Sequence, residues 1–386
     1  MIKRIVMMII SPLNERDYKR FGIEVLIENG FDVLIFDLSK LLFSLNNTKK
    51  YEDLVTPISS YIDLEKKINE IKFDSVFIPF FGISSKTIRV TYMLSRLNAT
   101  TVEYNTNIIP ITFQSISFIN KLKINIKSLT PSSLISKLNY IYITRLKSLR
   151  APDYAILGGS KSDRFSEENT KKIWTHTLDY DIFLEVDQQL ERIVDEKYCV
   201  YLDDYIPYHP DNKKVGLENT FKNIADSYYS KMNSFFDYIE KMYNLKIVIA
   251  AHPRAEYNKI GNVWQGREIY YNKSICLIKY ADFCMMHAST SINFPVLYNK
   301  PIIFLTLDEL NPLYGFIIDG FSRAVGAKKL FIENRLKKQE FDLKLEVDIQ
   351  MYENYKESYI KKNNTINKNS WQIFVDYIKE ENVIKK

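Results

Sequence analysis

The 386-residue sequence has few of the features that mark disulfide-rich, metal-binding or membrane-spanning proteins. Its three cysteines are an odd number without the close spacing of metal ligands, and each lies in an apolar run, so we expect buried thiols in a reducing compartment. No apolar stretch reaches the roughly 20 residues that span a bilayer. The apolar start at residues 1–10 ends at Ser11 without the small-residue cleavage site of a signal peptide, which favours a first strand. These absences predict a cytoplasmic protein.

Several catalytic motifs are also absent. The sequence contains no nucleophile elbow, no zinc-protease motif and no dinucleotide-binding fingerprint, which excludes those enzyme classes. Glycine is scarce, at 11 residues, and the turn at Gly158 and Gly159 lacks the spacing of the phosphate loop of nucleotide hydrolases. Asp179 and Asp181 match a short acidic metal motif, but their position before an apolar run is typical of a helix start. We therefore predict no metal site.

Acidic residues are missing from one long segment. Residues 104–152 contain no Asp or Glu, although the whole chain has a net charge of only +6. Basic residues alternate there with apolar ones, and they are Lys121, Lys123, Lys127, Lys137, Arg145, Lys147 and Arg150. Such a surface would suit anionic lipid at the inner face of the cytoplasmic membrane, or a phosphate-bearing acceptor. Solvated helix faces that merely lack acids are the alternative. Nucleic acid is not expected, because no nucleic-acid-binding motif accompanies the charge.

Strand and helix signals alternate along the sequence. Apolar strands are indicated at residues 3–10, 32–36, 74–82 and 151–157, with helical periodicity between them. A second series of the same kind begins near residue 198. Strands separated by helices imply crossover connections and parallel sheets.

The chain is too long for one hydrophobic core, which favours two domains. We expect an α/β protein with two Rossmann-like, doubly wound domains that face a cleft. The predicted bounds are residues 1–188 and 189–365. A C-terminal helix at residues 366–386 is expected to cross back to the first domain.

Polar side chains follow two apolar strands in the second half. They are His252 and Arg254 after one strand, and His287, Ser289, Thr290 and Ser291 after the next. Open α/β sheets bind ligands at the carboxyl ends of their strands. Imidazole, guanidinium and hydroxyl groups at that edge, before a helix predicted at residues 289–298, suit a phosphate. Helix capping alone would also explain the hydroxyls.

An acidic pair completes the candidate site. Asp203 and Asp204 end the first strand of the second half, where one carboxylate could act as general base on an acceptor hydroxyl. Turn formation is their alternative role. From the first half we include Gly158, Gly159 and His176 as candidate nucleotide-binding residues, the histidine because all four histidines of the chain lie between residues 176 and 287, near strand ends or turns.

Three segments together resemble bacterial surface-carbohydrate biosynthesis proteins of O-antigen and capsule systems. They are YLDDYIPYHPD at 201–211, VIAAHPR at 248–254 and HASTS at 287–291. Members of that family are regarded as GT-B-type glycosyltransferases that use CMP-activated nonulosonic acids such as pseudaminic acid. The resemblance, strongest from Trp174 to Thr306, implies transfer of such a sugar to a hydroxyl of a glycan or glycolipid acceptor. It implies a donor site in the second domain, an acceptor site in the first, and no cofactor or metal.

The same order of motifs also resembles bacterial sialyltransferases, which carry an acidic pair, a His-Pro motif and a serine/threonine motif. Carried over by position, Asp203 would deprotonate the acceptor, His252 would bind the CMP phosphate and assist its departure, and Ser289 with Thr290 would hold that phosphate. In the sialyltransferases glycine follows the acidic pair, whereas this chain has Tyr205. This difference leaves open which member of the pair is the base, and whether the reaction inverts.

Two other interpretations remain. CDP-polyol phosphotransferases of teichoic-acid type also pair a His-Pro strand end with a downstream serine cluster, and they would transfer phosphate rather than sugar. A catalytically silent scaffold would bind a nucleotide-sugar, or would bind a membrane enzyme through residues 104–152.

Overall fold

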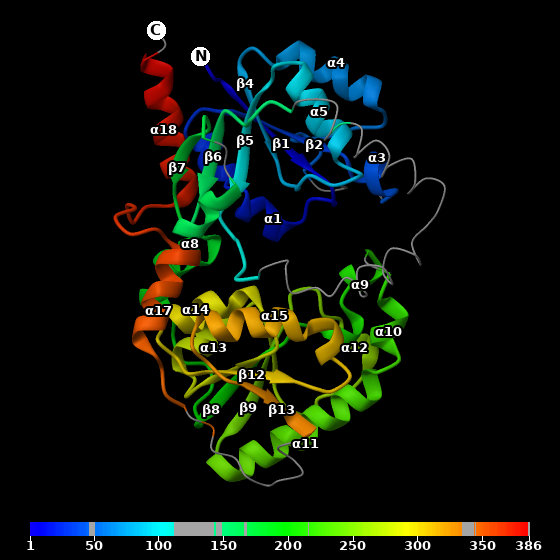
Figure 1. The fold of residues 1–386 in the computed structure, drawn as a ribbon, viewed down its shortest axis with the longest axis vertical. Coiled ribbons are helices and arrows are strands. Elements are labelled where there is room, and N and C mark those ends of the chain that lie inside the picture. The colour runs from blue at the N-terminus through cyan, green and yellow to red at the C-terminus, as the bar shows by residue number, and fades with distance from the viewer. Residues whose placement is uncertain are drawn as a thin grey trace. The chain divides into compact units, whose positions relative to one another are not determined.

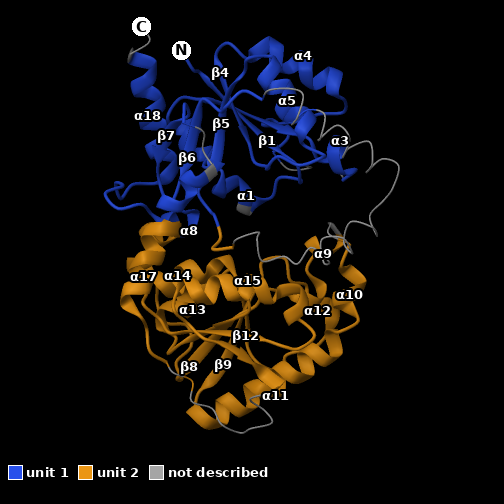
Figure 2. Cartoon of the chain, in the orientation of Figure 1, with its two compact units in different colours: residues 1–108, 124–181, 361–386 blue, residues 109–123, 182–360 orange. Residues whose placement is uncertain are grey.

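The computed structural model describes residues 1–45, 51–111, 143, 149–165, 168–214, 216–333, 343 and 345–384. The described residues divide into two compact units (Figure 2). Unit 1 lies within residues 1–108, 124–181 and 361–386, and unit 2 within residues 109–123 and 182–360. Apart from the short segment 109–123, the chain passes from unit 1 to unit 2 at 181/182 and returns at 360/361, whereas the sequence indicated 188/189 and 365/366.

Unit 1 contains a seven-stranded parallel sheet in the order β3-β2-β1-β4-β5-β6-β7 (Figure 1). Its strands are β1 (Arg4–Ile9), β2 (Asp32–Asp37), β3 (Val55–Pro57), β4 (Ser75–Pro79), β5 (Thr100–Asn105), β6 (Tyr154–Leu157) and β7 (Lys171–Trp174). Ile5 and Met7 of β1 belong to one core cluster, and Val6 and Met8 belong to another. Since successive side chains of a strand point to opposite faces, both faces of this sheet are covered.

Helices cover the two faces of this sheet. They are α1 (Glu15–Arg20), α2 (Ile23–Glu28), α3 (Ser39–Phe43), α4 (Tyr61–Ile71), α5 (Ile88–Arg96) and α18 (Ser370–Ile384), and α8 (Leu178–Val186) begins in this unit. The C-terminal α18 packs beside α2 and β7 (Figure 1). Trp371, Phe374 and Ile378 of α18 are buried in the unit 1 core, and the Trp371 indole donates a hydrogen bond to the Arg20 carbonyl (3.0 Å). The predicted return of the last helix to the first domain is confirmed.

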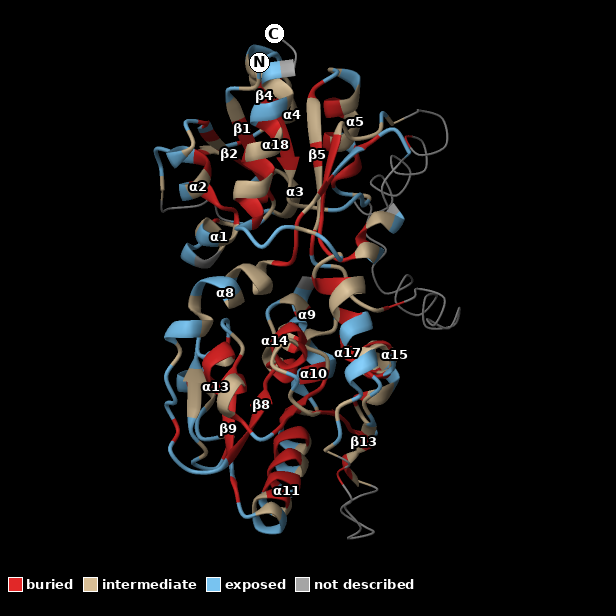
Figure 3. Ribbon diagram, turned by 90° about the vertical axis from the view of Figure 1, so that its left-hand side faces the viewer, coloured by how far each residue is buried: buried red, intermediate tan, exposed pale blue. Residues whose placement is uncertain are grey.

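Unit 2 contains a six-stranded parallel sheet in the order β10-β9-β8-β11-β12-β13. Its strands are β8 (Tyr198–Leu202), β9 (Lys246–Ala251), β10 (Ile269–Tyr271), β11 (Cys284–Met286), β12 (Ile302–Thr306) and β13 (Lys329–Phe331). Its helices are α9 (Asp211–Lys214), α10 (Glu218–Lys222), α11 (Ala225–Tyr243), α12 (Tyr257–Ile260), α13 (Ser274–Tyr280), α14 (Asn293–Leu297), α15 (Asn311–Ala324) and α17 (Ile349–Tyr355). The central strands and the inner side of α11 are buried (Figure 3).

The described residues test two expectations from the sequence, that the cysteines are buried and that no segment spans a membrane. Cys199, Cys276 and Cys284 are buried free thiols, as predicted. No helix in the described ranges combines the length and the apolar character needed to cross a bilayer. The basic residues from Lys121 to Lys147, predicted to meet anionic lipid or a phosphate-bearing acceptor, lie outside the described residues. Arg150 is described, and it pairs with Asp153.

The strand order of unit 2 creates a topological switch point. From β8 the chain continues to β9 on one side, and later returns to β11 on the other side. The connections leave β8 and β11 in opposite directions, and the carboxyl ends of the strands at such a switch point are where open α/β sheets bind ligands.

Candidate active site

The candidate residues of unit 2 lie at this switch point. Asp203 and Asp204 follow β8, His252 follows β9, and His287 to Ser291 follow β11. The three strands are adjacent, and their carboxyl ends are in register: Leu202 pairs with Ala250 on one side and Met286 on the other. The sheet therefore brings these segments together, as the sequence predicted from their positions at strand ends.

Asp203 is a buried carboxylate with protein donors on both oxygens. Oδ1 accepts the Tyr205 backbone N–H (2.9 Å), and Oδ2 accepts the Tyr257 hydroxyl. The backbone N–H of His252 also hydrogen-bonds to this carboxylate. Burial raises its pKa to about 6, and the three hydrogen bonds oppose that rise. Asp203 is only 4% exposed, so it is poorly placed to contact a substrate. Its hydrogen bonds instead link the end of β8 to the end of β9.

Asp204 is the more accessible member of the pair. Its Oδ2 accepts the Ala288 backbone N–H (2.9 Å), and the Ser289 hydroxyl also hydrogen-bonds to it. The side chain is only partly buried. Burial raises its pKa to about 7, and the neighbouring Asp203 charge adds to the rise. A partly exposed carboxylate that titrates near neutral pH suits general-base chemistry.

Tyr205 follows the acidic pair in a left-handed backbone conformation, with φ 52° and ψ 36°. Glycine adopts this conformation at little cost, whereas other residues adopt it at a cost of roughly 1–2 kcal/mol. The tyrosine ring is buried and packs edge-on against Tyr257, with ring centroids 5.4 Å apart. The turn typical of glycine is therefore kept, and ring packing offsets the backbone strain.

His252 lies in a cluster of charged and aromatic groups. Its Nδ1 accepts the Arg254 backbone N–H (3.2 Å), so the neutral ring carries its proton on Nε2. The ring stands edge-on to His209, with centroids 4.7 Å apart. The Arg254 guanidinium forms two hydrogen bonds with Asp211 (3.0 and 3.3 Å) and one with His209 Nε2 (3.2 Å). The charge of Arg254 is paired with Asp211, and the N–H groups that remain on the guanidinium and the His252 ring are donors that suit a phosphate.

Two residues of this cluster are absent from the site predicted from the sequence. His209 and Asp211 belong to the YLDDYIPYHPD segment that carries the resemblance, but no role was assigned to them. The His-Pro pair at 209–210 repeats the His-Pro pair at 252–253, and this repetition is a signal that could have indicated them.

His287 serves the core of unit 2. Its Nδ1–H donates to the Leu305 carbonyl (2.7 Å), which leaves Nε2 to accept the Tyr228 hydroxyl (2.9 Å). Tyr228 in turn accepts from the hydroxyl of Tyr201 (2.8 Å). Burial lowers the pKa of His287 to about 4, so the ring is neutral. Since the side chain is fully buried and both nitrogens are used, its ring is not available to a nucleotide, contrary to the role that we predicted.

The hydroxyl cluster begins with a short turn rather than with the continuous helix expected at 289–298. Thr290–Ile292 form a 3-10 turn, and α14 follows. The Ser289 hydroxyl caps this turn by accepting the Ser291 N–H (3.3 Å) and also bonds to Asp204. Thr290 is exposed and Ser291 is partly exposed, so these two hydroxyls are the better candidates for contact with a phosphate.

The three candidates from the first half belong to unit 1 and have structural partners there. His176 is fully buried, with Nε2 at 2.8 Å from the Lys368 carbonyl and Nδ1 at 3.2 Å from the Thr177 carbonyl. Asp179 and Asp181 lie in the first turn of α8, the helix start that the sequence indicated, and Asp181 also accepts the Ser370 N–H (2.8 Å) at the start of α18. Gly158 and Gly159 follow β6.

Gly158 is required by close backbone packing. A Cβ at this position would lie 2.4 Å from the Thr106 carbonyl oxygen, closer than real contacts allow. We expect Gly158→Ala to lower the free energy of unfolding by roughly 1–3 kcal/mol, because backbone has to shift to relieve the overlap. Denaturant unfolding of this variant and of Gly82→Ala, where a Cβ meets nothing within 4 Å, checks the expectation. Equal stability of the two variants would contradict it.

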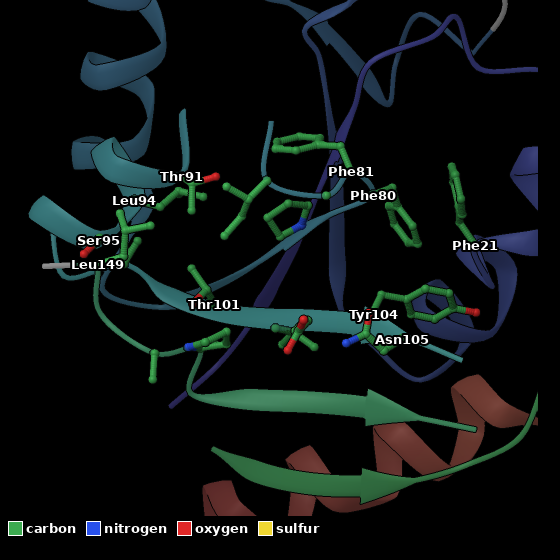
Figure 4. A pocket seen from close by; sticks show the side chains of 18 of the residues that line it. Phe21, Phe80, Phe81, Thr91, Leu94, Ser95, Thr101, Tyr104, Asn105 and Leu149 are labelled. Atoms are coloured by element: carbon green, nitrogen blue, oxygen red, sulfur yellow. The ribbon is translucent and has the colours of Figure 1, made fainter. Parts of the chain in front are cut away.

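Unit 1 contains a pocket of about 580 Å³ that runs along β5 and reaches the carboxyl ends of β1 and β4 (Figure 4). Phe21, Phe80 and Tyr104 gather on one side, where Phe80 stacks on Phe21 with centroids 3.9 Å apart. The Asn105 side-chain nitrogen is buried, and no acceptor among the described residues bonds to it. β1 and β4 flank the switch point of this sheet, so the pocket occupies a position where open sheets bind ligands. Its residues come from separate segments, and the sequence did not indicate it.

No group of three or more His, Cys, Asp and Glu side chains in the described ranges is arranged to hold a metal ion.

Comparisons of the chain with known proteins identify its fold. The structure is similar to CalG4, the calicheamicin glycosyltransferase, with TM-score 0.52 and 7% identity over 98% of each chain. It is similar to the glycotransferase of kitacinnamycin, with TM-score 0.53 and 9% identity over 98% of this chain and 99% of that one. The wall teichoic acid polymerase TagF gives TM-score 0.51 and 12% identity over 98% of this chain and 89% of that one. The chain has a GT-B-like fold. No protein-family model and no curated protein sequence matches it, and at these identities the likeness establishes the fold alone.

Proposed function

We propose that the protein is a glycosyltransferase that moves a nonulosonic acid, such as pseudaminic or sialic acid, from a CMP-activated donor to a hydroxyl of a glycan or glycolipid acceptor. One observation carries the proposal: a partly exposed carboxylate, an imidazole with its arginine, and two hydroxyls lie at three adjacent strand ends of unit 2. These groups supply the base and the phosphate donors that transfer from a CMP-sugar requires.

The reaction would break the bond between the anomeric carbon and the phosphate oxygen of the donor and release CMP. The Nε2–H of His252, the Arg254 guanidinium and the hydroxyls of Thr290 and Ser291 would donate hydrogen bonds to the departing phosphate. Arg254 keeps further N–H donors beyond those bound by Asp211. Asp204 would take the proton of the acceptor hydroxyl as its oxygen bonds to the anomeric carbon. Because these donors would stabilise the charge on the departing phosphate, the proposed transfer needs no divalent metal.

The unit 1 pocket supports a glycan as the acceptor. Aromatic rings pack against the apolar faces of sugar rings, and buried amide nitrogens can donate hydrogen bonds to sugar hydroxyls. Phe21, Phe80 and Tyr104 offer the first kind of contact, and Asn105 offers the second. A volume of about 580 Å³ is within the usual range for a small-ligand site.

A second candidate is a CDP-polyol phosphotransferase. The likeness to the teichoic acid polymerase TagF favours it, and the same imidazole and hydroxyls could hold a CDP-polyol. In that reaction the phosphate attached to the polyol, rather than a sugar, would pass to the acceptor.

One assay separates these candidates. We expect the purified protein to release CMP from CMP-sialic or CMP-pseudaminic acid in the presence of a mixed glycan acceptor, to give a product heavier by one nonulosonic acid, and to keep its rate in EDTA. Mass spectrometry and CMP detection give the readout, and CDP-glycerol is the parallel donor. Turnover of CDP-glycerol alone would replace the proposal with the second candidate, whereas CMP binding without turnover of either donor would indicate a scaffold. Loss of activity in EDTA would overturn metal independence.

A further inference from the structure

Tyr257 makes a contact that the mechanism above does not use. It is the first residue of α12, it is 5% exposed, and its hydroxyl donates to Asp203 Oδ2. Its ring packs edge-on against Tyr205 and Trp264, with centroid distances of 5.4 and 6.3 Å. The ring is therefore fixed, and the direction in which its hydroxyl points is fixed with it.

The same carboxylate holds the other end of the loop that Tyr257 closes. Asp203 accepts the backbone N–H of His252, the residue that directly follows β9. Between these two points the Ala255 N–H donates to the His252 carbonyl (2.8 Å), which makes residues 252–257 a tight loop. One buried carboxylate thus binds the beginning and the end of the loop that carries the candidate phosphate-binding imidazole.

We propose that Tyr257 is a positioning residue: its hydroxyl, together with the His252 backbone N–H, clamps loop 252–257 onto Asp203 and holds the His252 imidazole in place for the nucleotide phosphate. The inference rests on the proposed function, in which His252 meets that phosphate. Tyr257 itself acts only through Asp203 and touches neither substrate. Asp203 then has a different task from Asp204, since the first carboxylate orders the loop and the second takes the proton.

The electrostatics agree with this division. Burial raises the pKa of Tyr257 far above its usual value, so the phenol remains protonated and remains a donor. Its hydrogen bond lowers the pKa of Asp203, which burial raises to about 6. The other titratable groups whose charges interact with Asp203 are Asp204 and Tyr201 on the β8 side, Tyr205 in the following turn, and Tyr228 and Tyr229 on α11. Burial raises the pKa of each of these tyrosines, so they stay neutral at pH 7. Among these neighbours of Asp203, Asp204 is the group that titrates near neutral pH.

The test is Tyr257→Phe, with Tyr208→Phe as the matched control. Phenylalanine keeps the ring and removes only the hydroxyl, and Tyr208 packs on the same core without a hydrogen bond to Asp203. We expect the Asp203 carboxyl band in infrared spectra, assigned by its loss in Asp203→Asn, to titrate about one pH unit higher in Tyr257→Phe. We expect CMP affinity at pH 7 to fall about tenfold, with KM for the donor rising more than kcat falls. Tyr208→Phe should change neither quantity.

A double variant separates positioning from simple packing. If Tyr257 acts through Asp203, then Tyr257→Phe combined with Asp203→Asn should bind CMP as Asp203→Asn alone does. Additive losses, or an Asp203 titration unmoved in Tyr257→Phe, would overturn the inference. The infrared titration needs no nucleotide, so it tests the Tyr257–Asp203 contact by itself. A wild-type protein that binds no CMP would refute the proposed function, whatever the titration shows about that contact.

Discussion

Asp204→Asn is expected to lower the rate of transfer by about 10²- to 10⁴-fold while leaving the fold intact and CMP affinity within a few-fold of the wild type. Asparagine retains an oxygen that can accept the Ala288 N–H, so the link between β8 and β11 survives. It cannot take a proton from the acceptor hydroxyl. Measured kcat and CMP affinity would separate loss of the base from loss of the site.

The same substitution should raise stability at alkaline pH. Burial raises the pKa of Asp204 from 3.8 to about 7, so between about pH 4 and 7 the folded state binds more protons than the unfolded state. Wild-type stability therefore falls as pH rises through this range, and it remains reduced above pH 7. Asparagine does not ionise, so we expect the variant to exceed the wild type by roughly 1–3 kcal/mol at pH 8 and to match it at pH 4. Urea unfolding at both pH values measures this difference.

Asp203→Asn is the informative comparison for the predicted loss of transfer rate in Asp204→Asn. Its carboxylate accepts three hydrogen bonds, and an amide that turns its NH₂ group toward one of those donors loses that bond. We expect Asp203→Asn to raise KM for the donor more than Asp204→Asn does. A variant Asp204→Asn that keeps more than a tenth of wild-type kcat would contradict the assignment of the base, especially if Asp203→Asn abolished turnover.

The architecture could be predicted because its strands are buried on both faces. β8 and β12 are buried along their whole length, and such continuous apolar runs, separated by helical periodicity, are typical of doubly wound sheets. The spacing of Trp371, Phe374 and Ile378 predicted the last helix. The unit limits near 181 and 360 were less visible in the sequence, because the first of them falls inside α8 rather than in a loop.

The sequence indicated where the candidate site lies but not which of its groups a ligand can reach. His252 and His287 both follow apolar strands, yet His287 is fully buried with its nitrogens bound to Tyr228 and Leu305, whereas His252 is partly exposed. Asp203 and Asp204 are adjacent in the chain but differ in their hydrogen-bond partners. The Tyr257 hydroxyl, 54 residues further along the chain from Asp203, bonds to Asp203 and not to Asp204. Such partners are set by the packing of distant segments, and a local pattern does not contain them.

Replacing His252 with alanine is the second change with a large expected effect. In the proposed mechanism the imidazole would donate its Nε2–H to the departing phosphate, and a donor of this kind contributes about 10²- to 10³-fold to a rate when charge develops on the oxygen that it meets. We expect kcat to fall by that factor and CMP affinity to fall by about tenfold. His252→Gln should recover part of the rate, because its amide nitrogen can donate from a similar position.

His287→Phe provides the contrast, since the two histidines look alike in the sequence. Phenylalanine cannot donate to Leu305 or accept from Tyr228, and two buried polar groups lose their partner, so stability should fall by roughly 2–4 kcal/mol. The protein that remains folded should bind CMP as the wild type does, because this ring does not reach solvent. Rates and CMP affinities, measured below the melting temperature of each variant, make the comparison. If His252→Ala kept its rate within threefold of the wild type while His287→Phe lost CMP binding, the imidazole that serves the nucleotide would be the buried one, and the assignment made here would be reversed.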